Sequence, residues 1–387
     1  MTREPARWCV RHHRTLAYDI TECSSLFSPQ STALLLPGRL EGGRRFVVLD
    51  RQVAQHRGEE IASYFAHRKI DAKIVLFSGG EIDKTFDRYL DLLRELDAFP
   101  IHRRDEPIIA IGGGVLTDVV GYVASSYRRG VPHVKVPTTL MGYVDAAVGI
   151  KNGINFNGHK NRLGSFEPPL RVFLDRGFLK TLPRCHILNG VCEIIKLAII
   201  KDAHLFHLLE MHGSESIDAR FQNDTGEAIL RRAISGILEE LEPDLFEINL
   251  MRPMDFGHTF CYGLEARHED HLLHGEAVLL DIVVSVLIAQ RRHLLSVSET
   301  DRIFRLIDTL GIALDGSLLD PELMWRSLLD RVEHRNGHQS VPMPNPLGRC
   351  VFLNDISRRE IERSVEELEK WRNPWHESVC ECRSGRG

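Results

Sequence analysis

The sequence predicts an α/β domain with a Rossmann-like parallel sheet, followed by a mostly α-helical domain. Three observations support this prediction. Short β-branched runs alternate with helix-permissive stretches up to about residue 180, which is typical of a parallel sheet covered by helices on both faces. One of these runs leads directly into three consecutive glycines and an apolar helix. After Pro183 the pattern changes to long helical periodicity with few strand signals.

The first domain begins with two pairs of strand and helix. Residues 44–50, RRFVVLD, predict a strand, and a helix is expected from there to about residue 70. Residues 72–77, AKIVLF, predict a second strand, which the turn SGGE ends. The helix expected after this turn carries apolar residues at helical spacing, namely Phe86, Leu90, Leu93 and Leu96.

The remaining elements divide the chain near Thr181–Arg184. Residues 107–111 predict a third strand, the segment VLTDVVGYVASSY a helix, and residues 134–136 a fourth strand. In the second half, helices are expected in RCHILNGVCEIIKLAIIKD, over 228–241 and over 275–295. The domain boundaries that follow are an N-terminal extension over 1–30, an α/β domain over 31–182, a helical domain over 183–375 and a flexible tail over 376–387.

The composition favours a small-molecule partner. Of the 387 residues, 43 % are hydrophobic, which is enough to build two cores. The 49 Lys and Arg are balanced by 54 Asp and Glu, with a formal net charge of -5, so no nucleic-acid partner is expected. The longest apolar run, Ala277–Ala289, contains Asp281 and is too short to span a bilayer. It predicts a buried helix, and no membrane partner is expected.

The expected compartment is the cytoplasm. The segment MTREPARWCVRHHRTLAYDITE is basic but lacks the apolar stretch of a secretory signal. The eight cysteines form no paired framework and no CxxC pair, which is typical of a protein with free thiols.

The glycine turn GGGVLTD is a candidate dinucleotide site. Glycines between a strand and a helix expose backbone N–H groups at the helix N-terminus, where a pyrophosphate can approach closely. An isolated GGG is as often a simple tight turn. Asp50 at the end of the first strand and Asp118 beyond the glycines favour the dinucleotide, because an acid at such a strand end can bind a ribose.

A second candidate site is a metal centre. His258 follows a glycine in DFGH, and His274 precedes one in LHGE. A catalytic zinc needs three protein ligands, and Glu193 in CEIIK is a plausible third one, with Lys196 on the same helical face. The simpler interpretation is a surface Glu–Lys pair and ordinary histidines. His268 and His271, in the charged turn ARHEDH, are expected in solvent.

Several motifs together resemble a known family. GGGVLTDVVGYVASSYRRG, VPTTLMGYVDAAVGIKNGINF, HKNRLGSF, EIIKLAI, GHTF and LHGEAV, in this order, are similar to the 3-dehydroquinate synthase-like sugar phosphate cyclases. Within that family, GIKNGINFNGHKNRLGSFEPP, RPMDFGHTF and QSVPMPNPLGRCVFLND resemble the branch that forms C7 cyclitols. The resemblance implies the dehydroquinate synthase-like fold and a homodimer. It also implies bound NAD, a Zn2+ or Co2+ ion, and sedoheptulose 7-phosphate as substrate.

The resemblance also assigns residues by position. It implies three metal ligands, Glu193, His258 and His274. It implies substrate and phosphate contacts from Arg129, Asp145, Lys151, Lys160, Asn161 and Lys196, with Asp255 and Tyr262 beside them. It implies a dinucleotide site that comprises Asp50, Glu81, Lys84, Gly113, Gly114, Val115, Asp118, Thr138, Thr139, Lys151 and Lys160.

Two residues depart from 3-dehydroquinate synthases themselves. Tyr262 replaces the second histidine of the pattern GHTxGH, where many cyclitol synthases have proline, and a phenol has a much higher ordinary pKa than an imidazole. Asp255 stands where those synthases have an amide, which suggests a substrate with hydroxyls in place of a carboxylate. These departures disfavour 3-dehydroquinate synthase and leave the stereochemistry of the cyclitol open.

The expected reaction is a phosphate-eliminating cyclisation, a carbon–oxygen lyase reaction in which NAD is oxidant and then reductant within one turnover. The expected product is 2-epi-5-epi-valiolone, and 2-epi-valiolone or desmethyl-4-deoxygadusol stay open as alternatives. A metal-dependent glycerol or alcohol dehydrogenase has a similar domain plan, but the lysine-rich segment HKNRLG disfavours it, since a simple polyol needs no phosphate contacts. A catalytically inactive nucleotide-binding protein is disfavoured by the joint presence of Glu193, Lys196, His258 and His274.

Overall fold

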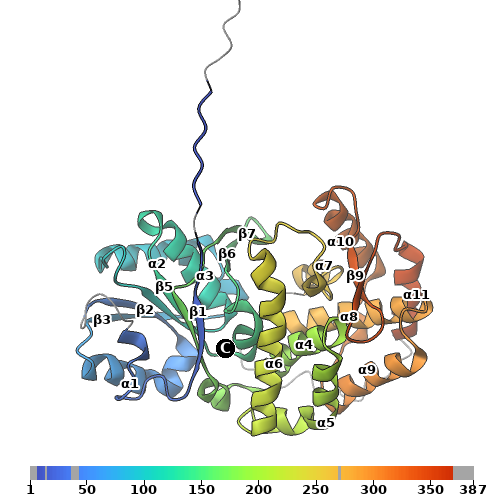
Figure 1. The fold of residues 1–387 in the computed structure, drawn as a ribbon, viewed down its shortest axis with the longest axis horizontal. Helices are drawn as coiled ribbons and strands as arrows, with labels where there is room; N and C mark the ends of the chain where they lie inside the picture. Colours follow the sequence, from blue (N-terminus) through green and yellow to red (C-terminus); the bar gives the residue numbers. More distant parts are fainter. Residues whose placement is uncertain (1–6, 14, 36–42, 269–271, 369–387) are drawn as a thin grey trace, which may run out of the picture.

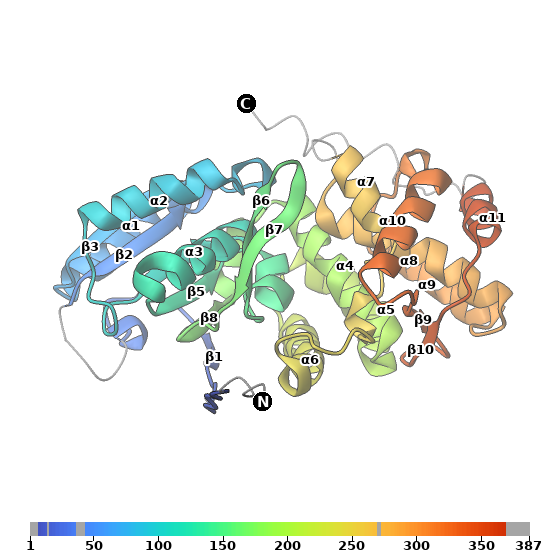
Figure 2. The same cartoon turned by 90° about the horizontal axis from the view of Figure 1, so that it is seen from above.

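The computed structural model describes residues 7–13, 15–35, 43–268 and 272–368. They form an α/β domain and a helical domain that lie side by side, as Figures 1 and 2 show in perpendicular views. The change from strands to helices falls between β8 (Arg171–Asp175) and α4 (Arg184–Ile200). The predicted fold class is confirmed.

The α/β domain is built on a six-stranded sheet with the strand order β1-β8-β5-β4-β2-β3, in which every neighbouring pair is parallel. The four predicted strands are present, as are two that were not predicted. With β8, the strands are β1 (Asp19–Cys23), β2 (Arg45–Asp50), β3 (Ala72–Phe77), β4 (Ile108–Gly112) and β5 (His133–Pro137). Parallel strands buried on both faces read as continuous apolar runs, which is why β2 and β4 were visible in the sequence.

Two hydrophobic clusters cover the two faces of this sheet. The helices are α1 (Arg51–His67), α2 (Phe86–Ala98) and α3 (Gly114–Ser126). The predicted apolar face of α2 needs correction, because its buried residues are Tyr89, Leu92 and Leu96, whereas Phe86 is 41 % exposed. On β5, the side chains of His133 and Lys135 are fully buried, and the ammonium of Lys135 donates a hydrogen bond of 3.2 Å to the carbonyl of Gly149.

The N-terminal residues that we expected to be an extension partly belong to this domain. β1 pairs with β8 along its whole length, and Leu26, Phe27 and Leu34 are buried in the core. The backbone N–H of Leu26 donates to the carboxylate of Asp175 at 2.9 Å. A partner about 150 residues away leaves no local sequence signal, so periodicity alone could not have found β1.

An antiparallel hairpin of β6 (Lys151–Phe156) and β7 (His159–Phe166) was also not predicted. The predicted phosphate segment HKNRLGSF is therefore a strand, largely exposed and too polar to give an apolar strand signal. The hairpin packs against α3, where a Cβ at Gly121 would lie 1.8 Å from the amide oxygen of Asn152. In Figure 2 it stands between the two domains.

The helical domain is formed around α4 and α8 (His274–Arg291), whose central residues are buried. The apolar run Ala277–Ala289 is therefore the buried helix that was predicted. The other elements are α5 (Ala203–Asp218), α6 (Asp224–Leu241), α7 (Cys261–Arg267), α9 (Val297–Thr309), α10 (Pro321–Glu333), α11 (Arg358–Leu368), and the antiparallel pair β9 (Val341–Pro344) and β10 (Cys350–Leu353).

Short helical turns connect these elements. They are η1 (Ala33–Leu35), η2 (Glu81–Asp83), η3 (Tyr127–Arg129), the π-helical turn η4 (Gly142–Ala146), η5 (Arg176–Thr181), η6 (Glu242–Asp244), η7 (Pro253–Asp255) and η8 (Gly316–Leu318). Within the described ranges, no helix has the length and apolar character needed to cross a membrane. The six cysteines of these ranges are free thiols, whereas Cys380, Cys382 and the predicted tail lie outside them.

Candidate metal and dinucleotide site

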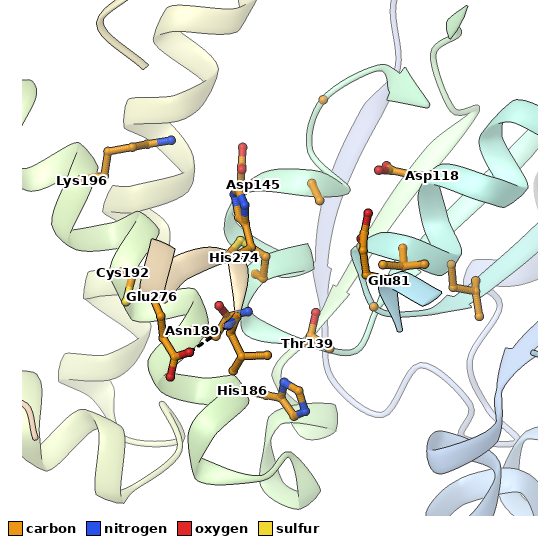
Figure 3. A pocket seen from close by; sticks show the side chains of 18 of the residues that line it. Glu81, Asp118, Thr139, Asp145, His186, Asn189, Cys192, Lys196, His274 and Glu276 are labelled. Atoms are coloured by element: carbon orange, nitrogen blue, oxygen red, sulfur yellow. Dashed lines mark hydrogen bonds between the residues drawn. The ribbon is translucent and has the colours of Figure 1, made fainter. Parts of the chain in front are cut away.

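A cavity of about 2270 Å³ is lined by both domains. On one side, Asp50, Gly113 and Thr138 lie at or just beyond the carboxyl ends of β2, β4 and β5. On the other side, residues of α4, α7 and α8 form the wall. Figure 3 shows Glu81 and Asp118 opposite Lys196, with Asp145 and His274 between them. Open α/β sheets bind ligands beyond the carboxyl ends of their strands, so the cavity lies at the expected place.

Three predicted metal ligands meet in this cavity. One ligand atom from each of Glu193, His258 and His274 lies within 4.8 Å of the other two, and within the described ranges no other group of three such residues does so. They come from α4, from the loop before α7 and from the first position of α8. Two histidines, one carboxylate and an open side toward a cavity are a donor set that fits a catalytic zinc.

Both histidines are held through their Nδ1 atoms. Nδ1 of His274 lies 2.6 Å from Oε1 of Glu265, and its Nε2 faces Oε1 of Glu193 at 3.5 Å. Nδ1 of His258 lies 3.2 Å from the backbone carbonyl of Phe256. Metal-binding histidines commonly donate their second ring N–H in this way, which leaves the other nitrogen for the metal.

The electrostatics also fit a cation. Glu193 is fully buried, and neither of its oxygens has a hydrogen-bond partner of normal geometry in the described part of the chain, although Lys196 is in ion-pair contact with Oε2. Burial would raise the pKa of Glu193, but Lys196 and the two histidines hold it below its ordinary value. Burial and the charge of Lys196 lower the pKa of His258 to about 3, so this ring is neutral at pH 7. An ionised carboxylate and a neutral imidazole are the forms that ligate zinc. Burial would lower the pKa of His274, but Glu265 and Glu193 raise it to about 10, so this ring has to lose a proton when a metal binds.

The interpretation of Glu193 and Lys196 as a surface pair is therefore wrong, since both are buried. Burial alone would lower the pKa of Lys196, but Glu193 and Asp145 raise it above its ordinary value. The ammonium thus stays charged in the wall of the cavity. Of the histidines expected in solvent, His268 is half-buried, and His271 lies outside the described residues.

Asp281 fixes the loop that carries His258. Its Oδ2 accepts hydrogen bonds from three consecutive backbone N–H groups, those of Thr259, Phe260 and Cys261, at 2.8 Å for the first and 3.1 Å for the last. Ser285 donates to Oδ1 at 3.2 Å. The sequence showed an acid inside an apolar helix, but gave no indication of what it binds.

Glycines shape the opposite wall. Gly113 precedes α3 and provides no side-chain cap, so the first N–H groups of the helix face the cavity without a competing acceptor from that position. A Cβ at Gly113 would lie 3.1 Å from Cγ2 of Thr139, and one at Gly114 would lie 3.0 Å from Cβ of Ala146. Val115 and Thr138 line the same wall. The predicted dinucleotide residues are thus brought together.

The acids and the lysine of this wall have partners within the protein. Oδ1 of Asp50 caps α1 by accepting from the N–H groups of Gln52 and Val53. Lys84 is buried and lies 2.8 Å from Asp118, and Glu81 accepts from the side-chain amide of Asn155 at 2.8 Å. Oδ2 of Asp50 faces the turn of Gly79 and Gly80, both at positive φ.

The polar residues expected around the substrate also line the cavity, with one exception. Asp145, Lys151, Lys160, Asn161, Lys196, Asp255 and Tyr262 are part of its lining. Lys151 pairs with Glu247 at 2.9 Å, and Lys160 pairs with Glu265 at 3.2 Å. Arg129 lies in η3 and is not among the lining residues, so within one chain it is not placed to contact a ligand there.

Asp255 differs from what its position suggested. It is buried, and its carboxylate is in contact with three arginines, Arg252, Arg331 and Arg335. Burial would raise its pKa, but these arginines lower it below the ordinary range. Asp255 is therefore ionised and already paired, which makes it an anchor for arginines in this wall.

Tyr262 lies on α7 beside the metal ligands. Its ring centroid is 6.1 Å from that of His258, and 54 % of its surface is exposed. The sequence did not point to Glu265, Asp281 or Glu247, because these acids have partners far along the chain, namely Lys160, the N–H groups of residues 259–261 and Lys151. Arg252, which pairs with the nearby Glu247 and Asp255, was not predicted either.

Comparisons with known proteins show the family to which the chain belongs. The family model described as 3-dehydroquinate synthase N-terminal matches residues 74–189, and the one described as 3-dehydroquinate synthase C-terminal matches residues 190–332. A 2-epi-5-epi-valiolone synthase of Streptomyces albus is 45 % identical over 95 % of this chain and 92 % of its own length. Another from Actinoplanes sp. is 46 % identical over 92 % of each. The structure of ValA, a 2-epi-5-epi-valiolone synthase of Streptomyces hygroscopicus subsp. jinggangensis with NAD+ and Zn2+ bound, is similar with a TM-score of 0.90 at 40 % identity, covering 94 % of this chain and 99 % of that one.

Proposed function

Because the chain belongs to the 3-dehydroquinate synthase family, we propose that it is a sugar phosphate cyclase that converts sedoheptulose 7-phosphate into 2-epi-5-epi-valiolone and phosphate. The observation that carries this proposal is the meeting of Glu193, His258 and His274 in a cavity that the glycine turn before α3 also lines. The reaction breaks a carbon–oxygen bond to phosphate, which makes the enzyme a lyase.

Bound NAD+ would supply reversible hydride transfer at one substrate carbon, and Glu193, His258 and His274 would hold a Zn2+ or Co2+ ion that supplies orientation and polarisation of substrate hydroxyls. The transient ketone acidifies the neighbouring C–H bond. Lys196 remains charged beside this centre and stabilises the negative oxygen that develops as the proton leaves.

Lys151, Lys160 and Asn161 bind the phosphate in this proposal. All three line the cavity from the hairpin β6–β7, and their N–H groups suit the oxygens of a dianion. A phosphate oxygen held there takes the proton from the neighbouring carbon as the carbon–oxygen bond breaks. The phosphate leaves with that proton, and little further acid–base machinery is needed.

The last step is ring closure. After the hydride has returned and the sugar ring has opened, the enol carbon attacks the carbonyl carbon within the same molecule and forms the carbon–carbon bond. A cavity that holds both ends converts a difficult encounter into a positioned unimolecular step. Met254 and Tyr262 line this part of the cavity and are proposed to shape it.

The alternative functions need different groups. A glycerol or alcohol dehydrogenase consumes NAD+ and needs no phosphate contacts, whereas Lys151, Lys160 and Asn161 line this cavity. A 3-dehydroquinate synthase binds a carboxylate and has histidine where this chain has Tyr262. Synthases of 2-epi-valiolone or desmethyl-4-deoxygadusol use the same groups, so the product distinguishes them.

The test is incubation of the purified protein with sedoheptulose 7-phosphate, catalytic NAD+ and Zn2+ or Co2+. Phosphate release without net NADH, with a cyclitol identified by NMR as 2-epi-5-epi-valiolone, supports the proposal. A different cyclitol would instead assign the enzyme to the synthases of 2-epi-valiolone or desmethyl-4-deoxygadusol. Accumulation of NADH on simple polyols without phosphate release contradicts a cyclase.

Tyr262 is expected to influence the product or the rate modestly. Its exposed phenol lies near His258, so Tyr262→Phe should lower turnover by less than about tenfold, the effect of one hydrogen bond. Tyr262→Pro falls in the first turn of α7, where proline is tolerated. Unchanged rate and product in both variants would exclude a role for this side chain.

The resemblance also suggests a cytoplasmic homodimer. Light scattering of the purified protein tests the oligomeric state, and fractionation of cells tests the compartment.

A further inference from the structure

Glu265 joins the two sides of the cavity. Its Oε1 lies 2.6 Å from Nδ1 of His274, and its Oε2 lies 3.2 Å from the ammonium of Lys160. His274 belongs to the helical domain, and Lys160 lies on β7 of the α/β domain. The carboxylate is 4 % exposed, so both contacts are largely shielded from water.

The contact with His274 sets the form of a metal ligand. The contact of Nδ1 with Glu265 leaves Nε2, on the side of Glu193, as the atom that would bind the metal. Glu265 thereby holds the ring in one orientation.

The contact with Lys160 sets the position of a cation on the opposite side. Lys160 is on a hairpin that is largely exposed, and Glu265 is the one acid within ion-pair distance of its ammonium in the described part of the chain. The ammonium lines the cavity, where it is available to a dinucleotide or a phosphate. Its position therefore depends on a carboxylate that a metal ligand also holds.

We propose that Glu265 is a positioning residue that couples the metal site to the dinucleotide site. This inference rests on the proposed metal and NAD+ sites. A metal ion that fixes His274 also fixes Glu265 and, through it, Lys160. Less conformational entropy is then lost when NAD+ binds, because Lys160 is already ordered. Coupling of this kind is reciprocal, and each ligand strengthens the binding of the other by the same factor.

The decisive variant is Glu265→Gln, which keeps the shape of the side chain and an oxygen for Nδ1 of His274 but removes the charge that holds Lys160. The dissociation constant of NAD+ is measured by calorimetry with and without Zn2+, and Zn2+ affinity is measured by competition with a chelator. We expect Zn2+ to tighten NAD+ binding at least about fivefold in the wild type. In the variant this ratio falls to about one, and Zn2+ affinity falls about 10- to 100-fold.

Lys160→Met removes the other partner of the ion pair between Glu265 and Lys160. It leaves the contact between Glu265 and His274 in place. The ratio of the NAD+ dissociation constants without and with Zn2+ should therefore fall to about one, while Zn2+ affinity stays within about threefold of the wild type. Glu322→Gln is the matched control and should keep the wild-type ratio, because Glu322 is a half-buried residue of α10 that pairs with Arg326 at 2.9 Å and Arg358 at 2.8 Å and does not line the cavity. Should Glu265→Gln fail to fold by circular dichroism, Lys160→Met decides the question alone.

The outcomes separate the inference from the proposed function. If the wild type binds both ligands but its NAD+ dissociation constant is the same with and without Zn2+, the coupling is wrong and the proposed cyclase function is unaffected. A wild-type ratio retained in Glu265→Gln or in Lys160→Met also overturns the coupling. A wild type that binds neither Zn2+ nor NAD+ overturns the proposed function and the coupling together.

Discussion

The two walls of the cavity offer a ligand different kinds of group. The wall of the α/β domain relies on its backbone, with Gly113 before α3 and the turn at Gly79 and Gly80. The wall of the helical domain relies on buried charged side chains, of which Glu193 and Lys196 are fully enclosed. Backbone donors carry no net charge, whereas a buried charge is tolerated only with its partners. The loss of one group should therefore be severe in the helical wall and mild in the glycine wall.

The largest effect is expected for Glu193→Gln. It removes a metal ligand and leaves the ammonium of Lys196 buried without its ion-pair partner. Turnover should fall at least about 1000-fold, since polarisation by a metal supplies several kcal/mol. Phosphate release and the metal content of the purified variant measure this. Full turnover by the metal-free variant would refute the ligand assignment.

A smaller effect is expected for Asp281→Asn. An amide keeps one oxygen for the three backbone N–H groups but removes the negative charge that strengthens these hydrogen bonds, so the loop of His258 should loosen. Zn2+ affinity should fall about 10- to 100-fold, and the free energy of unfolding should fall by about 2–3 kcal/mol. Chelator competition and urea unfolding measure the two quantities.

Ser285→Ala is the matched control for Asp281. It removes the hydrogen bond to Oδ1 and leaves the three backbone bonds in place. It should lower the free energy of unfolding by about 1 kcal/mol and leave Zn2+ affinity unchanged. Equal loss of Zn2+ affinity in both variants would show that the three backbone bonds are not what positions His258.

In the glycine wall, Gly113→Ala should have a milder effect. The new Cβ would lie 3.1 Å from Cγ2 of Thr139, so a small shift of the turn is required. The dissociation constant of NAD+ should rise about tenfold, equivalent to about 1.4 kcal/mol. Zn2+ affinity measured without NAD+ should not change. A parallel loss of Zn2+ affinity would contradict the separation of the two walls.

The smallest effect on function is expected for Lys135→Met, beneath the cavity. Burial lowers the pKa of Lys135 to about 8, so between about pH 8 and 10.5 the unfolded chain binds more protons than the folded one. Wild-type stability should rise over this range relative to the variant, by on the order of 3 kcal/mol. Urea unfolding of both proteins at about pH 7.5 and about pH 10.5 measures it. A constant difference between them would mean that Lys135 titrates normally.

Local patterns predicted the glycine wall well. The apolar runs of β2 and β4 and the glycines before α3 are contiguous in the sequence, so the fold class and a candidate dinucleotide turn with Asp50 and Asp118 followed from short segments. The other residues proposed for that site were implied by the resemblance. The metal ligands are distant from one another, and they were identified through the resemblance of several motifs taken together. Their meeting within 4.8 Å agrees with that assignment.

What the sequence did not predict depends on distant partners. Glu265 and Asp281 resemble ordinary acids until their contacts with Lys160 and with the loop of His258 are known. Two of the three arginines around Asp255, Arg331 and Arg335, lie 76 and 80 residues further along the chain, and Arg129 lies in η3, outside the cavity lining. Such pairings are created by the fold and leave no periodic signal.

The pairing of β1 with β8 has a consequence for how the chain is made. Asp19 pairs with Arg171, so the ribosome must add about 150 residues before the first strand can find its partner. At about 5–20 residues per second, this takes roughly 8–30 s. Leu26 and Phe27, which the finished protein buries, have no completed core to enter during that time. β1 is thus synthesised well before its partner β8 and docks late, and nascent chains halted before residue 171 should be substrates for chaperones.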